Sequence, residues 1–237
     1  MIVAHRLAAL RRAYDLPADA VEQLSLLLAL VAESPISLTT VREPADAVDV
    51  HIADSLLGLL VPEVRAASTV ADLGSGAGFP GLVLAAALPG ATVTLVEGVG
   101  RKAAFLADAH HRMGLTNVEV VSSRAEEWSA GSASQAVVTA RALAPLTTLV
   151  EYAAPLLVPG GTLVAWKGPA GGAETSDGAA AASLLGMSAP ELFVPPSHGQ
   201  RDNGGRDTRL YVSSKVSDTP PGYPRRPGMA RKRPIQA

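Results

Sequence analysis

Hydrophobic residues recur at helical spacing in the first third of the chain. Between residues 17 and 33 they occupy positions i, i+3, i+4 and i+7, as in Leu24, Leu27, Leu28 and Val31. This spacing places them on one face of a helix. Similar patterns predict helices over residues 4–13, 17–33 and 43–60. Residues 1–64 are therefore expected to form a helical lead-in.

The pattern changes after residue 65, where short apolar strands alternate with helices. Strands are expected over residues 69–73, 91–96, 118–121, 136–140 and 162–166, and helices over 81–88, 101–113 and 144–157. A turn is expected at residues 159–161, then a loop and a short helix in 168–190, and edge strands at 192–194 and 209–213. The alternation predicts an α/β core over residues 65–216, with a mostly parallel sheet and helices on both faces.

Charge separates the end of the chain from the rest. Residues 217–237 hold five basic residues and one acid, a net charge of +4, so the other 216 residues carry −6 within the total of −2. Five prolines in this segment interrupt regular structure, which predicts a basic, extended tail.

Composition narrows the class of protein. Hydrophobic residues make up 48% of the chain, which excludes a mainly disordered protein. The absence of cysteine excludes disulfides, thiolate zinc sites and a cysteine nucleophile. Basic residues interrupt the N-terminus where a signal peptide needs an apolar run, and no stretch reaches the roughly 18 apolar residues of a membrane span. We therefore expect a cytoplasmic protein with no membrane partner.

A glycine-rich loop follows the first predicted strand and carries the main chemical signal. It reads Asp72-Leu-Gly-Ser-Gly-Ala-Gly-Phe-Pro-Gly81 and precedes a predicted helix. Open α/β sheets bind ligands at this end of their strands. Gly76, Gly78 and Gly81 fit the G-x-G-x-x-G pattern of dinucleotide-binding enzymes. Gly74, Gly76 and Gly78 instead fit the acid-x-G-x-G-x-G pattern of S-adenosylmethionine methyltransferases.

The second alignment is favoured because the first places its tight turn farther from the strand and gives Asp72 no task. Glu97 ends the next predicted strand, where a carboxylate can accept hydrogen bonds from both ribose hydroxyls of either cofactor. Glu126 follows the third strand, where an acidic group commonly meets an adenine amino group. An equally good interpretation of Glu126 is a capping box with Ser122 or Ser123.

Further motifs extend this signal along the chain. They are Ser37-Leu38-Thr39, Arg42, His51-x-x-Asp54-Ser55-Leu56, Arg101-Lys102-x-x-Phe105-Leu106, Ser123-Arg124-Ala125-Glu126-Glu127, Ala140-Arg141-Ala142, Lys167-Gly168 and Tyr223-Pro224-Arg225-Arg226-Pro227-Gly228. Together with the glycine-rich loop, this set resembles the small-subunit ribosomal RNA guanine-N7 methyltransferase G family, also called glucose-inhibited division protein B. Two positions depart from the family pattern: Ser37 replaces an Asn, and Ala140 replaces a Ser.

The resemblance implies a Rossmann-like class I methyltransferase fold and the transfer of a methyl group from S-adenosylmethionine to N7 of a guanine in 16S ribosomal RNA. It places cofactor contacts at Gly74, Phe79, Ala125, Glu126 and Arg141. The loop and strand argument adds Gly76, Gly78 and Glu97 to these. The expected partner is 16S rRNA within the small ribosomal subunit.

Guanine N7 carries an exposed lone pair, so catalysis rests on positioning and needs no strong base. His51, Asp54, Ser55 and Arg141 are the candidates for this positioning. The first three lie within about one helical turn, so they could shape the base pocket or anchor the lead-in on the sheet. Arg141 could hold a phosphate or the methionine carboxylate, or form a surface salt bridge. No residue spacing indicates a metal site.

Lys167, Arg225 and Arg226 are candidates for contacts with RNA phosphates. The alternatives are a solvated loop lysine and a tail that only aids solubility. On the RNA interpretation, deleting the tail should weaken substrate binding and leave cofactor affinity intact. A nicotinamide-dependent (NAD) oxidoreductase and a non-catalytic RNA-binding assembly factor remain alternative functions.

Overall fold

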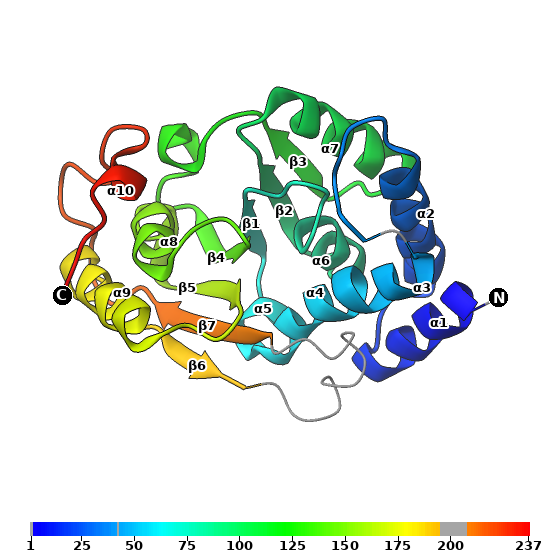
Figure 1. Cartoon of the computed structure of the whole chain (residues 1–237), viewed down its shortest axis with the longest axis horizontal. Coiled ribbons are helices and arrows are strands. Elements are labelled where there is room, and N and C mark those ends of the chain that lie inside the picture. Colours follow the sequence, from blue (N-terminus) through cyan, green and yellow to red (C-terminus); the bar gives the residue numbers. More distant parts are fainter. Residues whose placement is uncertain (1, 42, 195–207) are drawn as a thin grey trace.

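The computed structural model describes residues 2–41, 43–194 and 208–237 and is built around a seven-stranded sheet (Figure 1). The strand order is β3-β2-β1-β4-β5-β7-β6. The strands are β1 (Thr69–Leu73), β2 (Thr92–Val96), β3 (Val118–Val121), β4 (Gln135–Arg141), β5 (Leu157–Lys167), β6 (Glu191–Phe193) and β7 (Arg209–Ser214). The five strands β1 to β5 run parallel to one another, whereas β7 is antiparallel to both β5 and β6. The predicted α/β fold with a mostly parallel sheet is confirmed.

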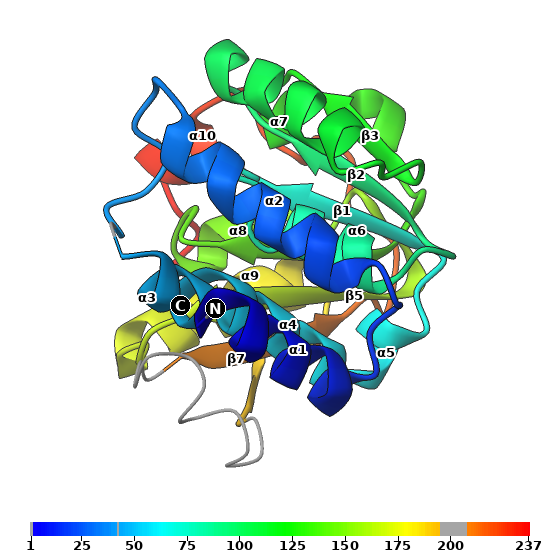
Figure 2. The ribbon, with the colours of Figure 1, turned by 90° about the vertical axis from the view of Figure 1, so that its right-hand side faces the viewer.

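Helices cover both faces of the sheet. One face carries α1 (Ile2–Tyr14), α2 (Ala20–Glu33), α6 (Gly81–Ala87) and α7 (Gly100–Arg112), and the other carries α8 (Leu146–Ala153) and α9 (Gly172–Leu185). Figure 2 shows α2 crossing in front of α6. Leu27 of α2, Leu84 of α6 and Leu106 of α7 are buried in one apolar cluster, so the lead-in and the sheet share a core. None of the helices that the structure describes is long and apolar enough to cross a membrane.

The third predicted helix, over residues 43–60, is helical along its length but is not a regular α-helix. It consists of α3 (Pro44–Ala47), a π-helical turn (Val48–Ala53), α4 (Asp54–Leu56) and a 3₁₀ turn (Leu57–Leu60), after which α5 (Pro62–Arg65) leads into β1. All six residues of the π-helical turn are buried. Its polar side chains find partners on other elements, since Asp49 pairs with Arg6 of α1 and His51 bonds Thr39. π-Helical turns are rare in proteins, and those that occur are often found at functional sites.

The two largest differences from the prediction lie in β5 and α9. β5 begins at Leu157, inside the helix predicted over 144–157, and the turn predicted at 159–161 lies within this strand. A Cβ atom on Gly161 would lie 2.9 Å from the carbonyl oxygen of Val158, so the close backbone packing there depends on glycine. α9 spans 14 residues where a loop and a short helix were expected. Alanine, the strongest helix former, fills its second half, and left-handed Gly186 ends it.

The C-terminal segment, residues 217–237, is folded onto the domain, so the prediction of an extended tail is wrong (Figure 1). It contains α10 (Met229–Lys232) and packs against α8. The Thr148 hydroxyl of α8 donates to the carbonyl oxygen of Ala230 at 3.2 Å, and Thr147 donates to that of Ile235 at 2.9 Å. The prolines prevent long helices and strands, but they leave backbone carbonyls that α8 can bind.

Candidate functional site

The glycine-rich loop turns sharply at the end of β1 and is held by contacts with the side chains of Glu97 and Leu143. Gly76 has a φ of +58°, which L side chains rarely adopt, and its N–H donates to Oε2 of Glu97 at 2.9 Å. A Cβ atom on Gly74 would lie 2.6 Å from Cδ1 of Leu143. A glycine is therefore needed at position 74 for close packing against Leu143, and at position 76 for the positive φ angle of the backbone.

Asp72, near the end of β1, holds this loop through hydrogen bonds to its side chain. Its carboxylate accepts hydrogen bonds from the Gly81 N–H at 3.1 Å and from the Thr139 hydroxyl at 2.9 Å. Burial raises the pKa of Asp72 from 3.8 to about 6, although these hydrogen bonds act in the opposite direction. Through these hydrogen bonds Asp72 connects β1 to β4 and to the start of α6.

Glu97 connects the loops that follow β1 and β2. Besides the bond from Gly76, its Oε1 accepts a hydrogen bond from the N–H of Val99 at 2.8 Å, and the residue is only 6% exposed. An ionised carboxylate has about four acceptor positions, so two remain for a ligand. These positions face a cavity, because Glu97 forms part of its wall.

The cavity beside Glu97 has a volume of about 410 Å³ and lies at the carboxyl ends of β1 to β4. Of the predicted cofactor residues, it brings together Gly74, Glu97, Ala125 and Glu126. It does not bring Gly76, Gly78, Phe79 or Arg141 to its wall. Its wall also includes Leu143, Tyr152, Gly228 and Arg231, which the sequence analysis did not identify. We refer to this space as the glycine-loop cavity.

Glu126 does not form the capping box considered above. Ala125–Glu127 is a 3₁₀ turn without a side-chain cap. Oε1 of Glu126 instead accepts hydrogen bonds from the Gly228 N–H at 3.1 Å and from the Tyr152 hydroxyl at 3.4 Å. Burial, reinforced by the neighbouring charge of Glu126, raises the pKa of Tyr152 and keeps its hydroxyl a donor.

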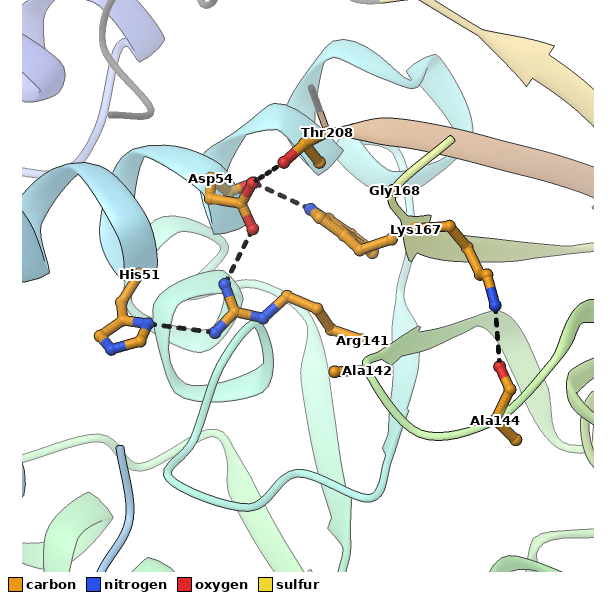
Figure 3. A pocket seen from close by; sticks show the side chains of 9 residues that line it. His51, Asp54, Arg141, Ala142, Ala144, Lys167, Gly168 and Thr208 are labelled. Carbon is orange, nitrogen blue, oxygen red and sulfur yellow. Dashed lines mark hydrogen bonds and ion pairs between the residues drawn. The ribbon is translucent and has the colours of Figure 1, made fainter. Parts of the chain in front are cut away.

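A second cavity, of about 320 Å³, lies between the π-helical turn and the ends of β4 and β5 (Figure 3). We call it the arginine cavity, because Arg141 lines it. Nη1 of Arg141 donates to Oδ2 of Asp54 at 2.8 Å, and Nη2 lies 3.3 Å from Nδ1 of His51. The side chains of Asp54 and Arg141 are 6% and 17% exposed, so they form a buried ion pair and not a surface salt bridge.

Two neighbours fix Asp54 further. Its Oδ1 accepts a hydrogen bond from the Thr208 hydroxyl at 2.6 Å, and its backbone carbonyl accepts one from the indole N–H of Trp166 at 2.8 Å. Both neighbours line the arginine cavity and were missed by the sequence analysis. The hydroxyl of Ser55 bonds the carbonyl oxygen of His51 inside the helix at 2.5 Å. The structure therefore brings His51, Asp54 and Arg141 together but turns Ser55 away from them.

Phe79 of the glycine-rich loop packs against two residues that line the arginine cavity. Its ring stacks on His51 with centroids 4.5 Å apart, and the Arg141 guanidinium lies 5.5 Å from its centroid. Ala142 lines both cavities and has a φ of +54°, a conformation that is uncommon for a residue other than glycine. The glycine-loop cavity and the arginine cavity are thus neighbours across one small residue.

The three residues predicted to contact RNA lie in different surroundings. Nζ of Lys167 pairs with Glu174 at 2.5 Å, donates to the Ala144 carbonyl at 3.2 Å and lines the arginine cavity. Arg225 is bound to the buried carboxylate of Glu151, whereas Arg226 is exposed. Arg42, part of one motif above, lies outside the described residues. In the described part of the chain, no cluster of three or more His, Asp or Glu side chains could hold a metal ion.

Comparison with known proteins supplies further information. A family model described as rRNA small subunit methyltransferase G matches residues 20–202. A protein of Rubrobacter xylanophilus named "Ribosomal RNA small subunit methyltransferase G" is 39% identical over 222 residues, which cover 91% of this chain and 85% of that protein. A protein of Moorella thermoacetica with the same name is 35% identical over 85% of this chain and 83% of its own length.

Solved structures resemble the fold at low sequence identity. A SAM-dependent O-methyltransferase of Thermotoga maritima aligns with a TM-score of 0.55 at 15% identity, over 70% of this chain and 66% of that one. The 16S rRNA (adenine(1408)-N(1))-methyltransferase of Catenulisporales acidiphilia aligns with a TM-score of 0.52 at 16% identity, over 69% of this chain and 92% of that one. These similarities show a fold shared with methyltransferases that use S-adenosylmethionine.

Proposed function

The chain belongs to the rRNA small subunit methyltransferase G family, and from that premise we propose that it transfers a methyl group from S-adenosylmethionine to N7 of a guanine in 16S ribosomal RNA. The observation that carries the proposal is the pair of cavities that meet at Ala142. A methyl transfer needs a cofactor and a base on either side of a short gap, held in line. The glycine-loop cavity would hold the cofactor, and the arginine cavity would hold the base.

The residues of the glycine-loop cavity fit S-adenosylmethionine. Its volume of about 410 Å³ is within the range of small-molecule sites, roughly 300–1,000 Å³. Glu97 has acceptor capacity left for ribose hydroxyls, and Glu126 lies beyond β3 on the side expected for adenine. Gly74 borders the end near Ala142, where the methionine part and its sulfonium would be held.

The bound cofactor would supply a methyl group on a positively charged sulfur. In the transfer, the lone pair of N7 forms the new N–CH₃ bond, the S–CH₃ bond breaks, and its electron pair stays on sulfur. The positive charge therefore moves to the guanine. An unpaired Arg141 beside the base would oppose this change, and Asp54 at 2.8 Å offsets its charge. The role proposed for His51, Asp54 and Arg141 is to shape a neutral, rigid base pocket.

The form of the substrate is the second part of the proposal. The body of the protein carries a net −6 outside residues 217–237, which disfavours tight binding to free RNA by charge alone. We therefore propose that the substrate is 16S rRNA assembled in the small ribosomal subunit, encountered in the cytoplasm. Arg226 and Lys167 would contact phosphates near the arginine cavity or beside the C-terminal segment.

The test uses tritiated S-adenosylmethionine with small ribosomal subunits that lack the modification and with naked 16S RNA. We expect label in the RNA of the subunits, recovered as 7-methylguanosine after digestion. The variant Gly76→Asp, which places a second carboxylate beside Glu97, serves as the inactive control. If neither RNA form is labelled, the proposed reaction is wrong. A thermal shift with NADH but none with S-adenosylhomocysteine would favour the oxidoreductase alternative.

A further inference from the structure

We propose that the C-terminal segment is a wall of the cofactor site and that Arg225 is the positioning residue that keeps this wall in place. The inference rests on the proposed function in one respect, because it takes the glycine-loop cavity as the site of S-adenosylmethionine. It replaces the expectation that this segment serves only RNA binding. It also reverses the expectation that cofactor affinity is independent of the segment.

Two residues of the segment reach the glycine-loop cavity. Gly228 and Arg231 both line it, although they lie about 100 residues after Glu126 in the chain. The N–H of Gly228 donates to Oε1 of Glu126 at 3.1 Å, which orients the carboxylate that follows β3. The segment therefore borders the cavity on the side expected for adenine.

Arg231 extends the same wall to a second loop. Its Nη2 donates to the carbonyl oxygen of Leu143 at 2.9 Å. Leu143 in turn packs against Gly74, since a Cβ atom on that glycine would lie 2.6 Å from its side chain. The segment thus contacts the loops after β3 and β4, and through Leu143 it reaches the loop after β1.

Arg225 anchors the segment to α8 with a forked contact. Its Nε lies 2.9 Å from Oε1 of Glu151, its Nη2 lies 2.5 Å from Oε2, and its backbone N–H donates to Oε1 at 3.1 Å. The side chain of Glu151 is 1% exposed. A buried carboxylate without a partner is strongly unfavourable. Glu151 is therefore satisfied only while the segment is docked, and docking places Gly228 and Arg231 at the cavity.

These contacts have a thermodynamic consequence. A ligand that touches Gly228, Arg231 or the Glu126 that they orient binds better to the docked form, so it also favours docking. Weakening the Arg225–Glu151 contact must then weaken ligand binding, even though neither residue lines the cavity. This is the behaviour expected of a positioning residue.

The experiment measures the Kd of S-adenosylhomocysteine for the full chain by calorimetry, well below every melting transition. We expect Arg225→Ala to raise Kd at least tenfold and Arg225→Lys to give an intermediate value, because a single ammonium cannot reproduce the fork. Arg231→Ala, at an exposed residue, should raise Kd at least threefold without lowering Tm. The matched control is Arg233→Ala, an exposed arginine of the same segment that does not line the cavity, and it should leave Kd unchanged.

A second ligand tests whether the wall contacts the adenine side of the cofactor or its amino-acid part. 5′-Methylthioadenosine keeps the adenine, ribose and thioether but lacks the amino acid. Its Kd should rise by the same factor as that of S-adenosylhomocysteine in Arg231→Ala. The inference is overturned if Arg231→Ala and Arg225→Ala bind both ligands as tightly as Arg233→Ala does. If the unmodified protein binds neither ligand, the assignment of the cavity itself fails.

Discussion

Replacing Asp54 by Asn removes one charge from the ion pair that lines the arginine cavity. The loss of one partner from a buried pair costs about 3–5 kcal/mol when the other charge is left uncompensated. Two features reduce this cost here. Arg141 is 17% exposed and also donates to the Val50 carbonyl at 3.2 Å, and Asn can still accept the hydrogen bond from Thr208. We therefore expect Asp54→Asn to lower the free energy of unfolding by about 2–3 kcal/mol.

This loss can be measured by urea denaturation, with thermal melting as a second readout. For a domain of this size, 1 kcal/mol shifts Tm by roughly 2–4 °C, so a decrease of about 4–12 °C is expected. A matched control is Asp108→Asn, which breaks an exposed pair with Arg112 on α7 and should cost less than about 1 kcal/mol. The rate of methyl transfer by Asp54→Asn should fall together with its stability, because Arg141 would then present an unpaired charge to the base.

A double-mutant cycle shows whether the charge itself is responsible. Arg141→Met in the Asp54→Asn background removes the orphaned cation, so the double variant should be more stable than the sum of the two single losses by at least about 1 kcal/mol. Additive losses, or an Asp54→Asn variant as stable as the Asp108→Asn control, would refute the reasoning.

Three further outcomes are expected. Gly76→Asp should raise the Kd of S-adenosylhomocysteine at least tenfold in calorimetry, because Gly76 has a φ of +58° and its N–H binds Glu97; unchanged affinity would contradict this placement. Asp72 has a raised folded-state pKa of about 6, so its contribution to stability is present below pH 4 and is lost as pH rises through 6. The stability of the unmodified protein relative to Asp72→Asn should therefore fall by roughly 2–2.5 kcal/mol between pH 4 and 7.5 in urea titrations, and a constant difference would argue against a raised pKa. Arg226→Ala should reduce the slope of log K for RNA against log salt by roughly 0.7–0.9 while leaving cofactor affinity unchanged, and an unaltered slope would exclude a phosphate contact.

The sheet could be predicted from the sequence because its parallel strands contain short apolar runs, and helices follow β1, β2 and β4. Gly74, Glu97 and Glu126 were found for the same reason, since each follows a strand and the carboxyl ends of parallel strands meet at one edge. The order of the strands could not be predicted, and the turn expected at 159–161 lies within β5, because both depend on pairing between distant segments.

The cluster in the arginine cavity was only partly accessible from the sequence. Asp54 and Arg141 are 87 residues apart, and no spacing rule relates them; their motifs entered through the family resemblance. Thr208 and Trp166 were missed because they are uncharged and reach Asp54 only through the antiparallel pairing of β5 with β7. Arg231 was noted as one charge of a basic tail, since composition does not show that the tail folds back.

The contact between Glu151 and Arg225 also bears on the synthesis of the chain. During translation, Glu151 is synthesised 74 residues before Arg225. The carboxylate of Glu151 therefore has no ion-pair partner in Arg225 until the C-terminal segment has been made. A nascent chain can assemble the sheet before then, but it cannot complete the wall at Gly228 and Arg231. A premature stop codon after β7 would therefore yield a polypeptide with all its strands, an unpaired carboxylate in α8 and an open cofactor site. Loss of the codons for residues 225–237 would therefore disable the cofactor site of this enzyme while leaving its sheet intact.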